Sequence, residues 1–255
     1  MPSKALRKGI VGIEAAIVLI AFVIVAAALA FVVLNMGFTT TQKSKEVMSS
    51  GLKEASTALE IDGSILGYAE TSGSADEIVI PIKAAPGRGY VDVHPARATV
   101  LYWTSGSSGQ GFTDIYVAYG YVYFNATSKT YYVVLYDEDN NQLDNANTNK
   151  NVLDIDAIRD AVRTIVTASS IGGTSSTPDI YAVVLWVESI QQYLSKDSNL
   201  EFGEKAIVLI DITSDTYKLS GYDTFKVELR PPEGAPLTVE RTMPPSIDAG
   251  VIDLG

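Results

Sequence analysis

Few residues in this sequence could carry out catalysis. His94 is the single histidine, and it precedes Pro95 between two strand-like runs. A lone histidine without a second candidate base is more often a turn or packing residue than a catalyst. The chain has no cysteine, which excludes thiol nucleophiles, disulfides and cysteine-ligated metal sites. The glycine-rich segment 106–111 lacks the lysine of a phosphate-binding loop, so we interpret it as a hairpin tip and predict neither enzymatic activity nor a cofactor.

An acidic segment offers the only metal-like spacing. Asp137, Asp139 and Asn141 are spaced like the first ligands of a calcium loop. The pattern then fails, because Gln142 stands where glycine is needed and Thr148 where a bidentate glutamate is expected. We therefore favour a solvated acidic loop and predict no metal site, with these three residues as weak candidates.

One glycosylation signal is present. Asn125-Ala126-Thr127 is a sequon for N-linked glycans at the end of a strand-like run. A surface position is expected there, so Asn125 is a candidate glycosylation site if the domain lies outside the cytoplasm.

The charge balance argues against nucleic-acid binding. Acidic residues number 30 and basic residues 19. Binding to phosphates needs basic patches, and the sequence shows none. A strongly acidic surface instead keeps copies soluble and mutually repelling.

The N-terminus contains a segment of membrane length. Lys4, Arg7 and Lys8 precede residues 15–34, which include no polar residue. Twenty helical residues at about 1.5 Å each span about 30 Å, the thickness of the hydrocarbon core of a bilayer. The basic residues favour a cytoplasmic N-terminus, which leaves the remainder of the chain outside.

Three kinds of segment compete for this region. A secretory signal has a shorter apolar stretch followed by a small-residue cleavage site, which Asn35-Met36-Gly37-Phe38 does not resemble. A plain single-pass anchor fits the length and the flanks. A type IV prepilin-like leader, which is cut before the apolar stretch, also fits.

The third interpretation is supported by a resemblance. Arg7-Lys8-Gly9 followed by Ile10 resembles the cleavage site of prepilins and of archaellin precursors, which are the filament subunits of archaeal flagella. Gly12 and Glu14 match residues at the third and fifth positions after that cut in these families. The resemblance implies a leader at residues 1–9, removed by a prepilin-type peptidase, and an apolar helix that stays on the mature protein.

The start of this helix carries features suited to assembly. Cleavage would create an ammonium group at Ile10, one helical turn from Glu14 or within reach of the glutamate of a neighbouring copy. A glutamate at the head of a membrane helix is costly unless it stays at the interface or finds a partner. Two pairs of small residues, Gly12 with Ala16 and Ala26 with Ala30, have the spacing that allows close helix packing.

The helix is expected to continue past the apolar stretch. Met48, Leu52, Ala55 and Leu59 form a stripe at helical spacing, and Asp62-Gly63-Ser64 reads as a stop signal. The sequence therefore predicts an assembly helix over residues 10–62, about 75 Å long up to residue 60, with a bend or local looseness at Gly37.

From Ala75 onward the periodicity is that of strands. Short runs rich in Val, Ile, Tyr and Thr are separated by Gly, Pro, Asn, Asp and Ser, which is typical of a β-sandwich. The predicted strands are residues 77–83, 98–103, 113–124, 130–136, 181–187, 205–212, 224–229 and 237–241, with a short helix within 153–168.

The C-terminal region strengthens the resemblance. Residues 200–205 and 222–241, then Pro244-Pro245 and the final Asp253-Leu254-Gly255, are similar to the late region of archaellins. Archaellins have an immunoglobulin-like outer domain, so the expected class is α+β: a long hydrophobic helix followed by an antiparallel β-sandwich over residues 63–255.

These observations predict a structural subunit of the archaellum filament. Its partners would be copies of itself, alone or with paralogous subunits, a prepilin peptidase, the archaellum assembly machinery, and the membrane before assembly. The filament would be extracellular, its precursor in the cytoplasmic membrane, and its role swimming. The alternatives are an adhesive type IV pilin and a membrane-anchored extracellular domain that binds sugars or peptides.

Overall fold

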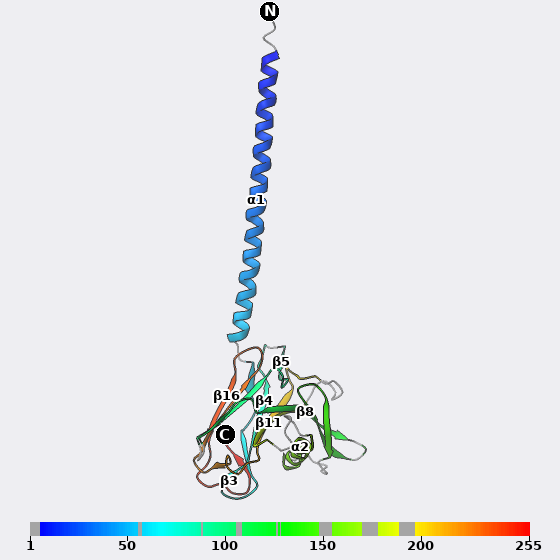
Figure 1. The fold of residues 1–255 in the computed structure, drawn as a ribbon, viewed down its shortest axis with the longest axis vertical. Coiled ribbons are helices and arrows are strands. Elements are labelled where there is room, and N and C mark those ends of the chain that lie inside the picture. Colours follow the sequence, from blue (N-terminus) through cyan, green and yellow to red (C-terminus); the bar gives the residue numbers. More distant parts are fainter. Residues whose placement is uncertain are drawn as a thin grey trace, which may run out of the picture. The chain divides into compact units, whose positions relative to one another are not determined.

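The computed structural model describes residues 6–55, 58–87, 89–105, 109–125, 127, 129–147, 155–169, 178–188 and 197–255. The chain divides into two compact units, Met1–Lys53 and Glu54–Gly255. We call the second unit the outer domain (Figure 1).

The first unit is a helical rod. Helix α1 covers Leu6–Ala55 without interruption. It continues through Gly37, where a bend was expected, and the hydroxyls of Thr40 and Thr41 donate hydrogen bonds to carbonyl oxygens one turn earlier, at 2.7 and 2.8 Å.

The predicted end of this helix was wrong. Leu59–Ile61 forms strand β1, which pairs antiparallel with strand β4, Glu77–Ala84. The side chain of Leu59 is fully buried in the outer domain. Burial and strand pairing there outweigh the helical spacing that Leu59 shares with Leu52, because local periodicity is a weaker determinant than tertiary packing.

The outer domain is built mainly from strands. The remaining elements are β2 (Leu66–Ala69), β3 (Ser74–Ala75), β5 (Tyr90–Asp92), β6 (Thr99–Thr104), β7 (Gly111–Phe112), β8 (Tyr116–Asn125), β9 (Thr130–Tyr136), β10 (Gln142–Asn147), α2 (Ile155–Ser169), β11 (Ile180–Glu188), β12 (Asn199–Glu201), β13 (Lys205–Ile212), β14 (Leu219–Ser220), β15 (Thr224–Arg230), β16 (Leu237–Thr242) and β17 (Gly250–Asp253).

Two larger sheets form the layers of this domain. One has the order β10-β9-β8-β11-β13-β4-β2-β17, with β1 also paired to β4, and the other has the order β16-β15-β6-β7. Two small ribbons, β12-β5 and β14-β3, complete the set in the described residues. Side chains of both large sheets share one apolar core, with Trp186, Tyr102 and Phe225 among its largest members.

A third layer lies on the opposite face of the larger sheet. Helix α2 packs Ile158, Val162 and Ile165 against residues of β11, including Val183 and Leu185. Alternate residues of β11 therefore face the two cores, which is the period of a strand buried on both sides.

The predicted class is confirmed in its main features: a long apolar helix precedes a mostly antiparallel β domain. The pair β8-β11 is parallel, so the sheet is not wholly antiparallel. All eight predicted strands and the predicted short helix are present, although β8 begins at Tyr116 rather than at Thr113, because Asp114 has a φ of 59° outside the strand region. The segment 106–111 joins the antiparallel strands β6 and β7, and residues 106–108 lie outside the described part.

Candidate functional site

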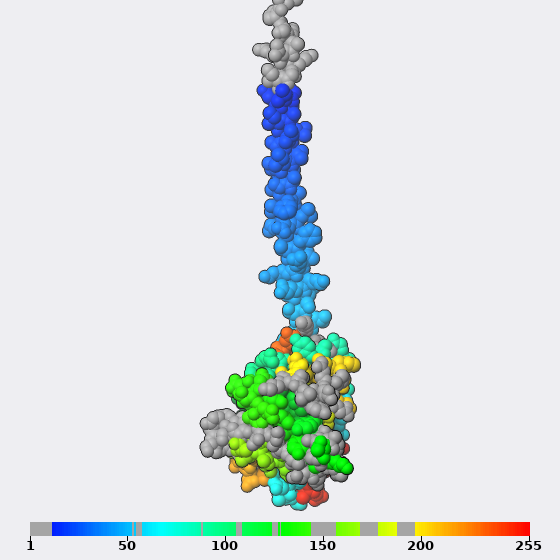
Figure 2. Space-filling view, turned by 90° about the vertical axis from the view of Figure 1, so that its right-hand side faces the viewer, coloured from blue at the N-terminus to red at the C-terminus, as the bar shows by residue number. Residues whose placement is uncertain are grey.

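The surface of α1 is the largest unpaired apolar surface among the described residues. Fourteen large apolar side chains between Ile13 and Leu34 are each 52–75% exposed. Helix residues Gly12–Leu52 are long and apolar enough to cross a membrane. In Figure 2 the blue side chains of α1 project freely along the visible face.

The energy of this surface is large. Burying a Val, Leu, Ile or Phe side chain stabilises by about 1.5–3 kcal/mol, so removing these fourteen from water is worth on the order of 20–40 kcal/mol. This energy exceeds the net stability of a whole folded domain, which is about 5–15 kcal/mol. A helix with that surface therefore requires lipid or other protein around it.

The predicted cleavage position lies within α1. Helix α1 begins at Leu6, so Gly9 and Ile10 are in its first turns rather than before it. The helix includes Arg7 and Lys8, whose side chains are outside the described part, whereas Lys4 is wholly outside it. Cleavage between Gly9 and Ile10 stays a prediction.

The predicted assembly residues occupy one continuous helix. Glu14 and Ala16 are exposed, and a Cβ atom added to Gly12 would meet nothing within 4 Å. Ala26 and Ala30 are likewise exposed and lie one turn apart. The helix therefore presents two pairs of small residues and one carboxylate to whatever surrounds it, and their role in assembly stays a prediction.

His94 has a structural position in the outer domain. It is buried, its Nδ1 accepts a hydrogen bond from the Ala96 amide at 3.2 Å, and its Nε2 lies 3.2 Å from Oδ1 of Asn140. Since Nδ1 accepts, Nε2 carries the hydrogen and donates a hydrogen bond to Oδ1 of Asn140. The ring also packs against Tyr119, with centroids 5.4 Å apart. The histidine thus joins two turns, as the sequence predicted.

The acidic segment forms a closed turn between β9 and β10. One Asp137 carboxylate oxygen accepts hydrogen bonds from the amides of Asp139 and Asn141, at 3.0 and 2.8 Å. The other oxygen accepts one from the Asn141 side chain at 3.2 Å. Within the described residues, no group of three His, Cys, Asp or Glu side chains is arranged to hold a metal ion. The Asp137 carboxylate is therefore used to stabilise the turn.

Asn125 is the last residue of β8 and pairs with Thr130 across the β8–β9 hairpin. Thr127 of the sequon is exposed, whereas the side chain of Asn125 lies outside the described part. A sequon in a hairpin connection suits a surface glycan, and glycosylation of Asn125 stays a prediction.

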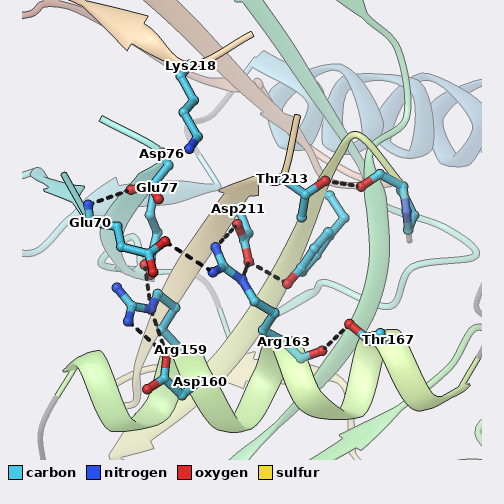
Figure 3. A network of polar contacts seen from close by, with 12 residues as sticks. Glu70, Asp76, Glu77, Arg159, Asp160, Arg163, Thr167, Asp211, Thr213 and Lys218 are labelled. Carbon is cyan, nitrogen blue, oxygen red and sulfur yellow. Dashed lines mark hydrogen bonds and ion pairs between the residues drawn. The ribbon is translucent and has the colours of Figure 1, made fainter. Parts of the chain in front are cut away.

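A buried polar network was not predicted from the sequence. The Arg163 side chain of α2 donates two parallel hydrogen bonds to Asp211 of β13, at 2.8 and 2.9 Å, and Tyr181 of β11 donates a third at 2.6 Å (Figure 3). Asp211 is fully buried. A charged carboxylate is tolerated there because all three contacts stabilise its ionised form.

The sequence did contain a signal for this network. Asp211 interrupts the apolar run of residues 206–212, and Arg159 and Arg163 are four residues apart beside the apolar face of the predicted helix. An acid within a buried strand requires a cation, and an arginine at the edge of a helix face can supply it.

Comparisons with known proteins agree with this architecture. The model of the family described as archaeal-type flagellin matches residues 9–241. The chain is 42% identical over 250 residues to probable flagellin 1 of Aeropyrum pernix, covering 98% of both chains. It is 31% identical over 260 residues to probable flagellin 2 of Archaeoglobus fulgidus, covering 96% of this chain and 95% of the relative.

A solved filament has a similar fold. The chain matches the structure of the archaeal flagellum of Methanospirillum hungatei strain JF1 with a TM-score of 0.50 at 24% identity, covering 94% of this chain and 98% of the other. The family match and the full-length relatives decide the assignment. The chain belongs to the archaeal-type flagellin family and is a structural filament subunit of the archaellum, not an enzyme.

Proposed function

We propose that this chain is made as a membrane-inserted precursor and polymerises through α1 after cleavage between Gly9 and Ile10, giving an extracellular swimming filament. The observation that supports this most is the contrast between the two units. The outer domain buries its own apolar cores, whereas α1 leaves an apolar surface of membrane length uncovered. Such a surface fits lipid first and copies of the same helix afterwards.

Insertion is directed by charge. Lys4, Arg7 and Lys8 precede the apolar helix, and basic residues beside a span stay in the cytoplasm. The outer domain is then translocated, and a prepilin-type peptidase reaches the Gly9–Ile10 bond at the cytoplasmic side. The assembly machinery of the archaellum receives the processed chain.

Cleavage changes the electrostatics of the helix end. It removes the three basic side chains of the leader and creates an ammonium group on Ile10. In the mature chain, Glu14 is one turn from that group. A pairing between this carboxylate and the amine of a neighbouring copy would set the axial position of each incoming subunit, because an unpaired charge is costly among apolar helices.

The remaining charge resides in the outer domain. Residues 10–55 contain three basic and three acidic side chains, whereas residues 56–255 contain 13 basic and 27 acidic ones. Outer domains of net charge −14 repel one another, so cohesion must come from the neutral helices. Contacts between different surfaces of successive copies, which do not close into a ring, produce an open filament.

The test is mass spectrometry of the N-terminus in filaments sheared from cells. A mature start at Ile10 supports the proposal, and an intact Met1 found only in membranes refutes it. The variant Gly9→Val should leave unprocessed precursor in the membrane, with Gly37→Ala as the control that is processed normally. Glu14→Gln should be processed yet yield few filaments, whereas Glu46→Gln on the same exposed helix should assemble like the unaltered chain.

A further inference from the structure

Three neighbouring strands bring polar side chains together beneath α2. In register, Glu77 of β4 is opposite Asp211 of β13, and Asp211 is opposite Tyr181 of β11. On its other side Glu77 is opposite Tyr68 of β2. Two carboxylates placed directly across from each other repel, and both are buried, at 1% exposure for Glu77 and 0% for Asp211.

The two carboxylates are unequally compensated. Asp211 accepts three strong hydrogen bonds, from Arg163 and Tyr181 (Figure 3). Among the residues that the structure describes, Oε1 of Glu77 has no hydrogen-bond partner, and its Oε2 lies 3.8 Å from Nε of Arg159, beyond hydrogen-bond distance. The charge of Asp211 is therefore satisfied by its contacts and the charge of Glu77 is not.

Arg159 is engaged elsewhere. Its Nε and Nη2 donate to Asp160 at 3.1 and 2.8 Å, and its guanidinium carbon lies 4.2 Å from the centre of the Tyr68 ring. Its Nη1 has no hydrogen-bond partner in the described part of the chain. The cation nearest to Glu77 is thus held by an exposed carboxylate and an aromatic ring rather than by Glu77 itself.

These surroundings favour the neutral form of Glu77. Burial raises the pKa of Glu77 well above its usual range, and the charge of Asp211 raises it further. Arg159 and Arg163 on α2 lower the pKa of Glu77 and the adjacent Asp76 raises it, and the sum is upward. Burial also raises the pKa of Asp76 itself.

We propose that Glu77 is a proton-binding residue that couples the docking of α2 to pH. With a proton on Glu77, Asp211 is the charged member of the facing pair of carboxyl groups, and Arg163 neutralises it. Without that proton, two buried negative charges face each other across β4 and β13, and α2 loosens from the sheet. The coupling belongs to the outer domain and does not depend on leader cleavage or on polymerisation.

The direction of the effect follows from the higher proton affinity of the folded state. Stability from this site is fully present below the pKa of an unfolded glutamate and is lost as pH rises through the raised folded pKa. This is opposite to an ordinary ion-paired carboxylate, which stabilises above its pKa. The outer domain of an extracellular filament would thereby hold α2 most firmly in acid.

The test measures hydrogen exchange of α2 residues 155–169 in the full-length chain in detergent, between about pH 4 and pH 8. Exchange is corrected for its intrinsic pH dependence with unstructured peptides. The opening equilibrium of α2 should rise about tenfold for each unit by which the folded pKa of Glu77 exceeds its unfolded value. The variant Glu77→Gln, which is neutral at every pH, should remove this rise.

The matched control is Glu70→Gln. The Glu70 carboxylate lies 3.8 Å from Arg163 but is 58% exposed, so its replacement should keep the rise of the unaltered chain. Equal pH profiles in the unaltered chain and Glu77→Gln would overturn the proposal. Should Glu77→Gln fail to fold, infrared titration of Asp76→Asn decides, because this variant lacks the other buried carboxyl group of raised pKa. A protonated carboxylic acid persisting above the ordinary range of glutamate supports the proposal, and its absence refutes it.

Discussion

The pair between Arg163 and Asp211 makes a demanding prediction about stability. Replacing Arg163 by Met keeps the aliphatic length of the side chain but leaves Asp211 fully buried with only the Tyr181 hydroxyl as a donor. Breaking a buried ion pair from one side costs about 3–5 kcal/mol. For a domain of this size, that loss lowers the melting temperature by about 6–20 °C.

Tryptophan fluorescence of the full-length chain in detergent can measure this loss. Both tryptophans, Trp103 and Trp186, lie in the outer domain, and α1 contains no tryptophan or tyrosine. Trp186 is 2% exposed, so its emission reports unfolding of the core. Arg230→Met is the control, because the Arg230 side chain is 55% exposed and its pair with Glu228 is worth at most about 1 kcal/mol.

A double-mutant cycle separates the charge effect from lost packing. Asp211→Asn removes the buried charge, so adding it to Arg163→Met should recover part of the loss, and the two substitutions should be strongly non-additive. The reasoning is refuted if Arg163→Met melts no lower than Arg230→Met. Additive losses in the cycle would also refute it, because they would mean that the two side chains act independently.

Three further predictions concern the outer domain. Gly120→Ala should destabilise it by more than about 3 kcal/mol in the same melting assay, because an added Cβ would lie 2.0 Å from the carbonyl oxygen of Val134. Hydrogen bonds from two lysines lower the pKa of Asp62. The stability that this carboxylate contributes is therefore present above the unfolded pKa and is lost as acid protonates it. In Asp62→Asn, the melting temperature should depend less on pH in this acid range. Chelation of divalent cations should leave the melting temperature unchanged, because hydrogen bonds of the chain itself satisfy the Asp137 carboxylate.

Elements with a strong apolar period could be predicted from the sequence. The apolar run of residues 15–34 predicts a helix of membrane length, and α1 contains it. The helical spacing of Ile158, Val162 and Ile165 predicted α2 at its correct place in the chain. Leu59 was misassigned because its spacing fits a helix while its burial is set by strands far along the chain. Strands of two or three residues, such as β3 and β14, are too short to show a period.

The polar network was less predictable than the fold. Asp211 and Arg163 are 48 residues apart, and only the placement of α2 over β13 brings them together. The parallel pairing of β8 with β11 was also not predictable from the sequence, because it depends on the chain returning to the sheet through α2. A charged residue in an apolar strand predicts a partner of opposite charge, but the identity of that partner depends on tertiary structure.

The uncovered surface of α1 also constrains the order of assembly. Passing through water would expose side chains whose burial is worth on the order of 20–40 kcal/mol, more than a whole folded domain supplies. In the proposed assembly, the helix would therefore leave lipid and contact neighbouring helices in one continuous step. The outer domain has no such requirement, because its apolar cores are already covered. In the proposed assembly it can fold as soon as it is translocated. A chain that joins the growing filament would then have a folded outer domain and a helix that still lacks packing partners.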